Sequence, residues 1–127
     1  MTPVVLVVQD DFGERAGALV ADAFVWMVNS PVNGAAARSL WARGHGAGTS
    51  RLTTFDRSAG EAHEALVRRA FVMIDDHHGE WTHSQWSEIE VIGCPLSDAL
   101  REEAALLGGE GVDPTLDGFR LTRRRGP

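Results

Sequence analysis

Residues 3–9, with the sequence PVVLVVQ, are the stretch that decides the fold class. Its residues 4–8 are all apolar, so the run lacks the alternation of a half-exposed strand. Its β-branched valines favour an extended strand that is buried on both faces. Strands of this kind are typical of parallel sheets whose two faces are covered by helices. The stretch therefore predicts an α/β fold with this segment inside the sheet.

Strand-like and helix-like segments alternate along the rest of the chain. Further strands are expected at residues 24–28, 51–55, 87–93 and 119–122, with the last one at a sheet edge because it alternates and is charged. Helices are expected at residues 14–22, 30–43, 58–79 and 97–107. Ser30 before Pro31 is a typical helix start, and Ser58 with Glu61 has the spacing of a capping box.

This order predicts a single α/β domain over residues 1–119. We expect a three-layer sandwich around a mainly parallel sheet of four or five strands. Residues 120–127 are expected to form an Arg-rich strand end and tail. The pattern leaves open the strand order and whether residues 71–74 belong to the third helix or to an extra strand.

The expected sheet has a polar rim. Ligands of open α/β sheets bind outside the carboxyl ends of the strands, where side chains from several strands converge. The residues expected there after the first three strands are Asp10, Asp11, Asn29, Ser30 and Asp56. These side chains are the candidates for a site at the rim.

Three of these residues give the sequence a resemblance to response-regulator receiver domains. Asp10 and Asp11 follow the first expected strand and Asp56 follows the third. In that family, acidic residues at such places hold Mg²⁺ and accept a phosphoryl group, so the resemblance implies a receiver- or flavodoxin-like topology. The chain contains no Lys, and the lysine that the family places after its fifth strand is therefore missing. The resemblance thus extends to the topology, and we do not expect a working phospho-acceptor.

The segment Asp75 to Trp81, DDHHGEW, concentrates groups that bind metals or carry protons. Asp75 and His78 are spaced i, i+3, which places them on one face of a helix, but no HExxH-type motif is present. The expected end of the helix favours His and disfavours Asp, so the carboxylates there are expected to be compensated by Arg68, Arg69, a neighbouring His or a basic partner. A metal or acid–base site in this segment is the alternative. We expect no metal, no cofactor and no catalytic residue.

Two tryptophans lie close together in the loop expected at residues 80–86. Tryptophan is enriched among the residues that dominate binding energy at protein interfaces, and neighbouring acids suit a partner rich in Arg or Lys. The predicted partner-binding residues are Asp75, Asp76, His77, His78, Glu80, Trp81, His83 and Trp86.

The charge is acidic and unevenly distributed. The 18 acidic and 12 basic residues give a net charge of −6, which divides into −10 over residues 1–119 and +4 over residues 120–127. An acidic body repels nucleic-acid phosphates and attracts basic proteins, so nucleic acid is expected to be contacted only through Arg123 to Arg125. The lack of Lys excludes mechanisms that depend on a lysine.

The remaining features predict a cytoplasmic protein. Cys94 is the only cysteine, so the chain cannot form an internal disulfide, and an inert buried thiol is expected. The N-terminus lacks the features of a signal peptide, and no apolar run approaches the ~20 residues of a membrane span.

Two classes of function are consistent with these observations. The first is a small acidic binding protein without catalysis, comparable to the bacterial immunity proteins that inhibit basic toxins such as nucleases. The second is a small metal- or nucleotide-dependent enzyme, or a degenerate receiver-like signalling domain. It would use either Asp10, Asp11 and Asp56 or a second set, namely Asp75, His77, His78 and His83. We favour the first class because no catalytic set is assembled in the sequence.

Overall fold

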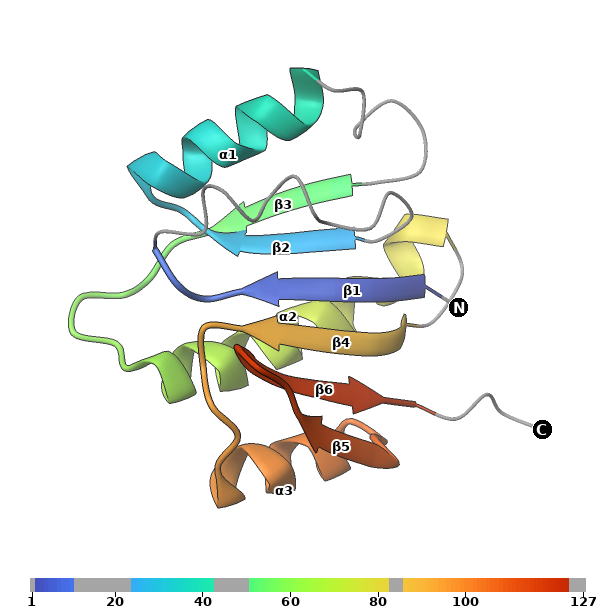
Figure 1. Cartoon of the computed structure of the whole chain (residues 1–127). Helices are drawn as coiled ribbons and strands as arrows, with labels where there is room; N and C mark the ends of the chain where they lie inside the picture. Colours follow the sequence, from blue (N-terminus) through green and yellow to red (C-terminus); the bar gives the residue numbers. More distant parts are fainter. Residues whose placement is uncertain (1, 11–23, 43–50, 83–85, 124–127) are drawn as a thin grey trace.

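The computed structural model describes residues 2–10, 24–42, 51–82 and 86–123 (Figure 1). The described residues form six strands and three helices. The strands are β1 (Thr2–Val7), β2 (Phe24–Val28), β3 (Arg51–Phe55), β4 (Trp86–Ile92), β5 (Gly111–Pro114) and β6 (Gly118–Thr122). The helices are α1 (Pro31–Ala42), α2 (His63–Thr82) and α3 (Asp98–Leu106). The helix expected at residues 14–22 lies outside the described residues.

The six strands form one sheet in the order β3-β2-β1-β4-β6-β5. β1 lies inside this sheet and pairs in parallel with β2 on one side and with β4 on the other. Residues Val4 to Val8 are all buried. The prediction that the opening apolar run is a strand buried on both faces is therefore confirmed.

The predicted mainly parallel sheet of four or five strands is wrong. β3, β2, β1 and β4 are paired in parallel, whereas β6 is antiparallel to β4 and β5 is antiparallel to β6, so two of the five strand pairings in the described sheet are antiparallel. The crossover through α3 leads to β5, a strand of four residues that the sequence reading missed. A short turn joins β5 to β6, and such a turn forces antiparallel pairing. The segment expected to be an edge strand, β6, thus lies between β4 and β5.

The receiver- or flavodoxin-like topology is also wrong. That topology has the strand order 2-1-3-4-5, in which the first and third strands are neighbours. Here β2 separates β1 from β3. Adjacent strands are about 4.8 Å apart, so the ends of β1 and β3 are separated by roughly twice that distance.

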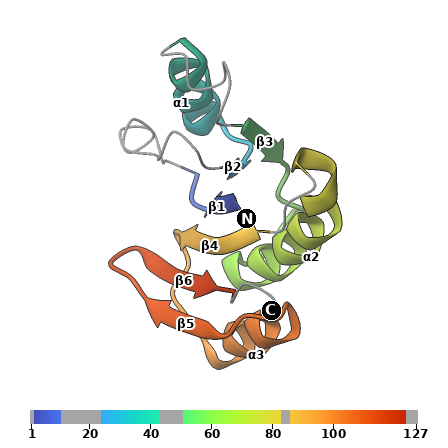
Figure 2. The ribbon, with the colours of Figure 1, turned by 90° about the vertical axis from the view of Figure 1, so that its right-hand side faces the viewer.

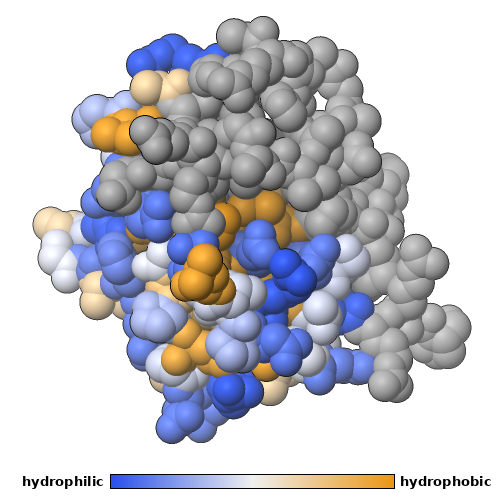
Figure 3. Space-filling view, in the orientation of Figure 1, coloured by the Kyte–Doolittle hydropathy of each residue, from blue (hydrophilic) through white to orange (hydrophobic). Residues whose placement is uncertain are grey.

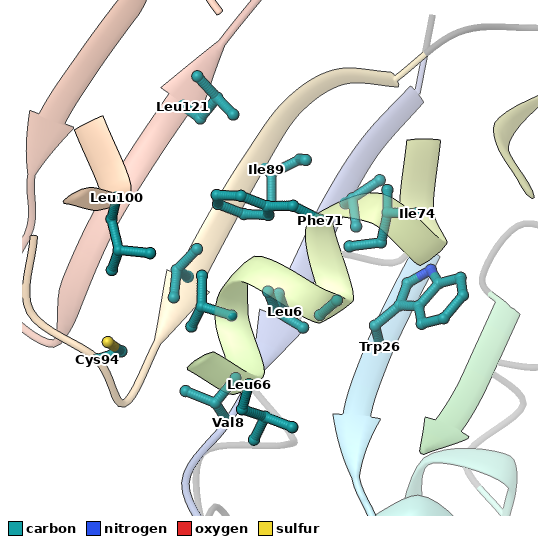
Figure 4. Close-up of a cluster of buried hydrophobic side chains, with 14 of the residues drawn as sticks. Leu6, Val8, Trp26, Leu66, Phe71, Ile74, Ile89, Cys94, Leu100 and Leu121 are labelled. Carbon is teal, nitrogen blue, oxygen red and sulfur yellow. The ribbon is translucent and has the colours of Figure 1, made fainter. Parts of the chain in front are cut away.

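Helix α2 covers one face of the sheet and supplies much of the core (Figures 2 and 4). Figure 4 shows Leu66, Phe71 and Ile74 of α2 directed toward side chains of the strands, and all three are fully buried. Phe71 packs edge-on against Phe119 of β6. Residues 71–74 are therefore helical. Each fully buried side chain of this size contributes roughly 1.5–3 kcal/mol to folding.

The ends of α2 differ from the expected ends. The helix begins at His63 rather than at Ser58, since Gly60 has a φ of +73° that a helix cannot contain. Glu61 still accepts a hydrogen bond from the Ser58 backbone N–H, which is one half of the expected capping box. At the other end, α2 continues through Gly79 to Thr82. The expected loop at residues 80–86 is therefore partly helical, and its last residue begins β4.

Figure 2 shows α2 and α3 on one side of the sheet and α1 on the other side, near β3. On the α1 side, Val5, Val7, Val25, Met27 and Ile92 are buried. None of the described helices covers β4, β6 and β5 on this side (Figure 2). Within the described residues, no helix is both long enough and apolar enough to span a membrane.

Candidate functional site

Four of the five predicted rim residues meet where β1, β2 and β3 end. Asp10 follows β1, Asn29 and Ser30 follow β2, and Asp56 follows β3. The amide of Asn29 donates a hydrogen bond of 3.0 Å to the Asp56 carboxylate, which links the ends of β2 and β3. The fifth residue, Asp11, lies outside the described residues.

Ser30 and Asn33 connect the rim to the first turn of α1. The Ser30 hydroxyl donates to the Asp10 carbonyl oxygen at 2.8 Å and accepts from the Asn33 backbone N–H at 3.0 Å, as expected for an N-cap. The Asn33 side-chain amide donates to the carbonyl oxygens of Gln9 and Val28. Asn33 is 1% exposed, so its amide satisfies carbonyl groups that would otherwise be buried without partners.

Arg57 is the cation of the rim, and the sequence reading did not select it. Its guanidinium donates to the Val8 carbonyl at 2.7 Å and to the Glu61 carbonyl at 3.0 Å. It lies 3.5 Å from the Asp10 carboxylate, which is a long contact for an ion pair. Arg57 and Val8 are 49 positions apart in the sequence. Their contact can therefore be recognised only once the pairing of the strands is known.

Beside the rim, Glu61 and Arg69 form a two-pronged ion pair. Nε of Arg69 donates to one Glu61 oxygen at 3.0 Å and Nη2 donates to the other at 2.8 Å. The hydrogen bond from Arg69, followed by the Ser58 backbone N–H, lowers the pKa of Glu61 to about 2. Arg69 also donates to the Asp56 carbonyl, so the pair fixes the turn between β3 and α2.

These contacts give the rim a structural function. Asp10 and Asp56 follow strands that are separated by β2, and each contacts a neighbour of its own rather than the other acid. Within the described ranges, no three His, Cys, Asp or Glu residues lie close enough together to hold a metal ion. The geometry that the receiver resemblance implied is not formed by Asp10 and Asp56.

The loops after β1 and β4 are in close contact. Open α/β sheets commonly bind ligands between such loops, where the connections leave the sheet in opposite directions. Here, a Cβ atom on Gly93 would lie 2.8 Å from the backbone nitrogen of Gln9. The Gly93 N–H donates to the Asp117 carbonyl in the β5–β6 turn. The backbones at Gly93 and Gln9 are therefore in direct contact, and no space for a ligand remains between these two residues.

The second predicted surface lies at the C-terminal end of α2. Trp86 is 1% exposed and belongs to the core, so its ring is not a surface anchor in this structure. Its indole N–H points to the Asp75 carboxylate at 3.4 Å. Asp76 is exposed. The side chains of His77, His78, Glu80 and Trp81, and the whole of His83, lie outside the described part of the chain.

Arg123 provides the compensation that Asp75 was expected to find in Arg68 or Arg69. Its guanidinium lies 4.3 Å from the centre of the Trp86 ring and 3.8 Å from the Asp75 carboxylate. It also donates to the Leu107 carbonyl at 3.0 Å. Arg123 belongs to the segment expected to form an Arg-rich strand end and tail, and it joins the end of β6 to α2 and to the end of α3.

Cys94 follows β4 and is buried. Burial, with a smaller effect of the Glu64 carboxylate, raises the pKa of this thiol. A raised pKa reduces the thiolate fraction, and the thiolate is the nucleophilic form. The expectation of an inert thiol is consistent with this environment.

An acidic cluster lies on the open face of β4, β6 and β5. The strand register places Glu90, Arg120 and Asp113 in one row across the three strands. Arg120 contacts Glu90 at 2.6 Å and Glu88 at 3.4 Å, and the hydrogen bond with Glu90 is the main cause of its raised pKa. Two carboxylates therefore contact one guanidinium group, and a third, that of Asp113, belongs to the same row.

Comparisons of the chain with protein-family models, with curated proteins and with solved structures found no match.

Proposed function

We propose that this protein is a non-catalytic acidic binding protein that associates with a basic protein partner. The closest functional analogy is a bacterial immunity or inhibitor protein that neutralises a basic enzyme such as a nuclease. The acidic surface of the protein would attract the partner and orient it before contact.

One observation carries this proposal, namely that most of the described arginines are engaged within the molecule. The side chains of Arg57, Arg68, Arg69, Arg120 and Arg123 each contact a carboxylate or a carbonyl oxygen of the same chain. Acidic side chains remain exposed at Asp76, Asp98, Glu102 and Asp113. Among the described residues, carboxylates thus outnumber guanidinium groups at exposed positions.

Affinity capture from the organism that makes the protein, followed by binding measurements with the purified captured protein, tests the proposal. We expect a partner with a basic isoelectric point and an affinity that falls as salt is raised, mainly through a slower association rate. An acidic partner, or an affinity that salt does not change, would contradict the proposal. Binding that requires added Mg²⁺ or nucleotide would favour an enzymatic function instead.

A further inference from the structure

We infer that the basic partner docks on the open face of β4, β6 and β5, and not on the C-terminal end of α2. This inference rests on the proposed function and assigns a surface to it. The docking face is defined by Glu88, Glu90, Asp113, Arg120 and the turn residue Leu116.

The first argument is that none of the described helices covers this face of the sheet. Figure 2 shows α2 and α3 on the opposite side, and the β5–β6 turn projects toward the open side. The space-filling view of this side shows mainly hydrophilic residues with hydrophobic patches between them (Figure 3). Strands hold their side chains in fixed positions, so the charges of the docking face are ordered before a partner arrives.

The second argument is the local balance of charge. On the docking face, Glu88 and Glu90 both contact the guanidinium of Arg120, and Asp113 lies opposite Arg120 in the neighbouring strand, so three carboxylates are grouped with one cation. At the sheet rim, by contrast, Glu61 is paired with Arg69 and Asp10 lies near Arg57. On the helical side, Arg123 faces Asp75 and Arg68 pairs with Glu103. Among these described ion pairs, Arg120 is the one whose guanidinium contacts two carboxylates, so the negative charge of the docking face is concentrated around a single cation.

The third argument is the geometry available to a cation. Arg120 contacts one oxygen of Glu88 and one oxygen of Glu90, so each carboxylate has a second oxygen that can accept a hydrogen bond. Asp113 stands on the other side of Arg120 in the same row. Guanidinium groups bind carboxylates in a planar, two-pronged manner, so arginine side chains fit this arrangement better than lysines.

The fourth argument is an exposed apolar residue in the turn that follows Asp113 and precedes Arg120. Leu116 lies in the β5–β6 turn and is 98% exposed, although a side chain of this type is usually buried. An apolar contact beside charged pairs is the usual composition of an interface, in which an anchor is surrounded by polar groups. The expected occupant is therefore an arginine-rich protein surface that also carries an apolar or aromatic side chain.

A pair of charge-matched variants tests this inference. Asp113→Arg changes the docking face and Asp76→Arg changes α2, and both variants raise the net charge by the same amount. Long-range attraction is therefore altered equally, and any difference between them reports the location of the contact. The probe is a short capped peptide of arginine and tryptophan, with its dissociation constant measured at low and at moderate salt.

We expect Asp113→Arg to weaken peptide binding by about tenfold and Asp76→Arg by less than about threefold. Leu116→Ser, which leaves the charge unchanged, should weaken binding several-fold. Titration of the ¹⁵N-labelled wild-type protein should shift the amide signals of β4, β6 and β5 more than those of α2. Circular dichroism of each variant verifies that it is folded.

The possible failures are distinguishable. If Asp76→Arg weakens binding more than Asp113→Arg and the shifted signals lie on α2, the docking face is wrong while the proposed function stands. If the wild-type protein shows no saturable, salt-dependent binding to the peptide or to a captured basic protein, the proposed function itself fails.

Discussion

At the scale of single residues, Gly93 shows how closely the loops after β1 and β4 approach each other. Its φ of +101° is a conformation that side chains with a Cβ rarely adopt, and a Cβ atom would lie 2.8 Å from Gln9. Gly60 also has a positive φ, of +73°, but nothing lies within 4 Å of its Cβ position. A side chain would be strained by the positive φ at both positions, but it would overlap a neighbour only at Gly93. Comparing the two substitutions therefore distinguishes the cost of backbone strain from the cost of steric overlap.

We expect Gly60→Ala to lower the free energy of unfolding by about 1–2 kcal/mol, which is the cost of the left-handed conformation alone. Gly93→Ala should cost about 3 kcal/mol or more, because overlap with Gln9 adds to that strain. Urea denaturation of both variants measures the difference. Equal losses would mean that the Gln9–Gly93 contact relaxes freely.

Glu61 makes stability depend on acid pH. Its pKa is lowered to about 2 from the ordinary value of 4.5, so its contribution is complete above about pH 4.5 and is lost as the pH falls through about 2. Glu61→Gln should therefore unfold at lower urea concentrations than the wild type at neutral pH. The difference in midpoint should shrink as the pH approaches 2, and a difference that is independent of pH would show that the ionised pair is not its source.

The rim shows what could be predicted at the scale of residues. The rule that polar side chains converge at strand ends correctly grouped Asp10, Asn29, Ser30 and Asp56. The rule did not find Arg57, whose contact with Val8 spans 49 residues of the chain. Nor did any local signal show that the indole of Trp86 is buried, because tryptophan occurs both in cores and on surfaces.

At the scale of elements, the strands with strong apolar runs were predicted and the short polar strand was not. β5 has the sequence Gly111-Val112-Asp113-Pro114, and Gly, Asp and Pro are all uncommon in strands. It forms because β6 offers a partner and because Val112 packs against the core. Tertiary contacts thus outweigh local propensity here, and this single strand changes the sheet from mainly parallel to mixed.

Arg123 joins three elements, so its removal should be costly. We expect Arg123→Ala to lower the free energy of unfolding by about 2 kcal/mol, from the lost contact with the Trp86 ring and the lost hydrogen bond to Leu107. Arg101→Ala, at an exposed position on α3, is the matched control and should change it by less than about 0.5 kcal/mol. Thermal and urea denaturation provide the measurement, and similar losses in both variants would argue against a specific role of Arg123.

At the scale of the whole molecule, stability is expected to decrease from the centre of the sheet to its edges. β1 and β4 are paired on both sides, whereas β5 is an edge strand of four residues. Native-state hydrogen exchange should find the slowest amides in β1 and β4 and the fastest strand amides in β5. Uniform protection across the sheet would contradict this gradient.

The central place of β1 has a consequence for biosynthesis. Residues 2–7 leave the ribosome before residues 86–92, which form one of their two neighbours in the sheet. At about 5–20 residues per second, the N-terminal valines wait on the order of ten seconds for that neighbour. During this interval an apolar strand edge is open to wrong partners, so the nascent chain is expected to need chaperone protection until most of it has been synthesised.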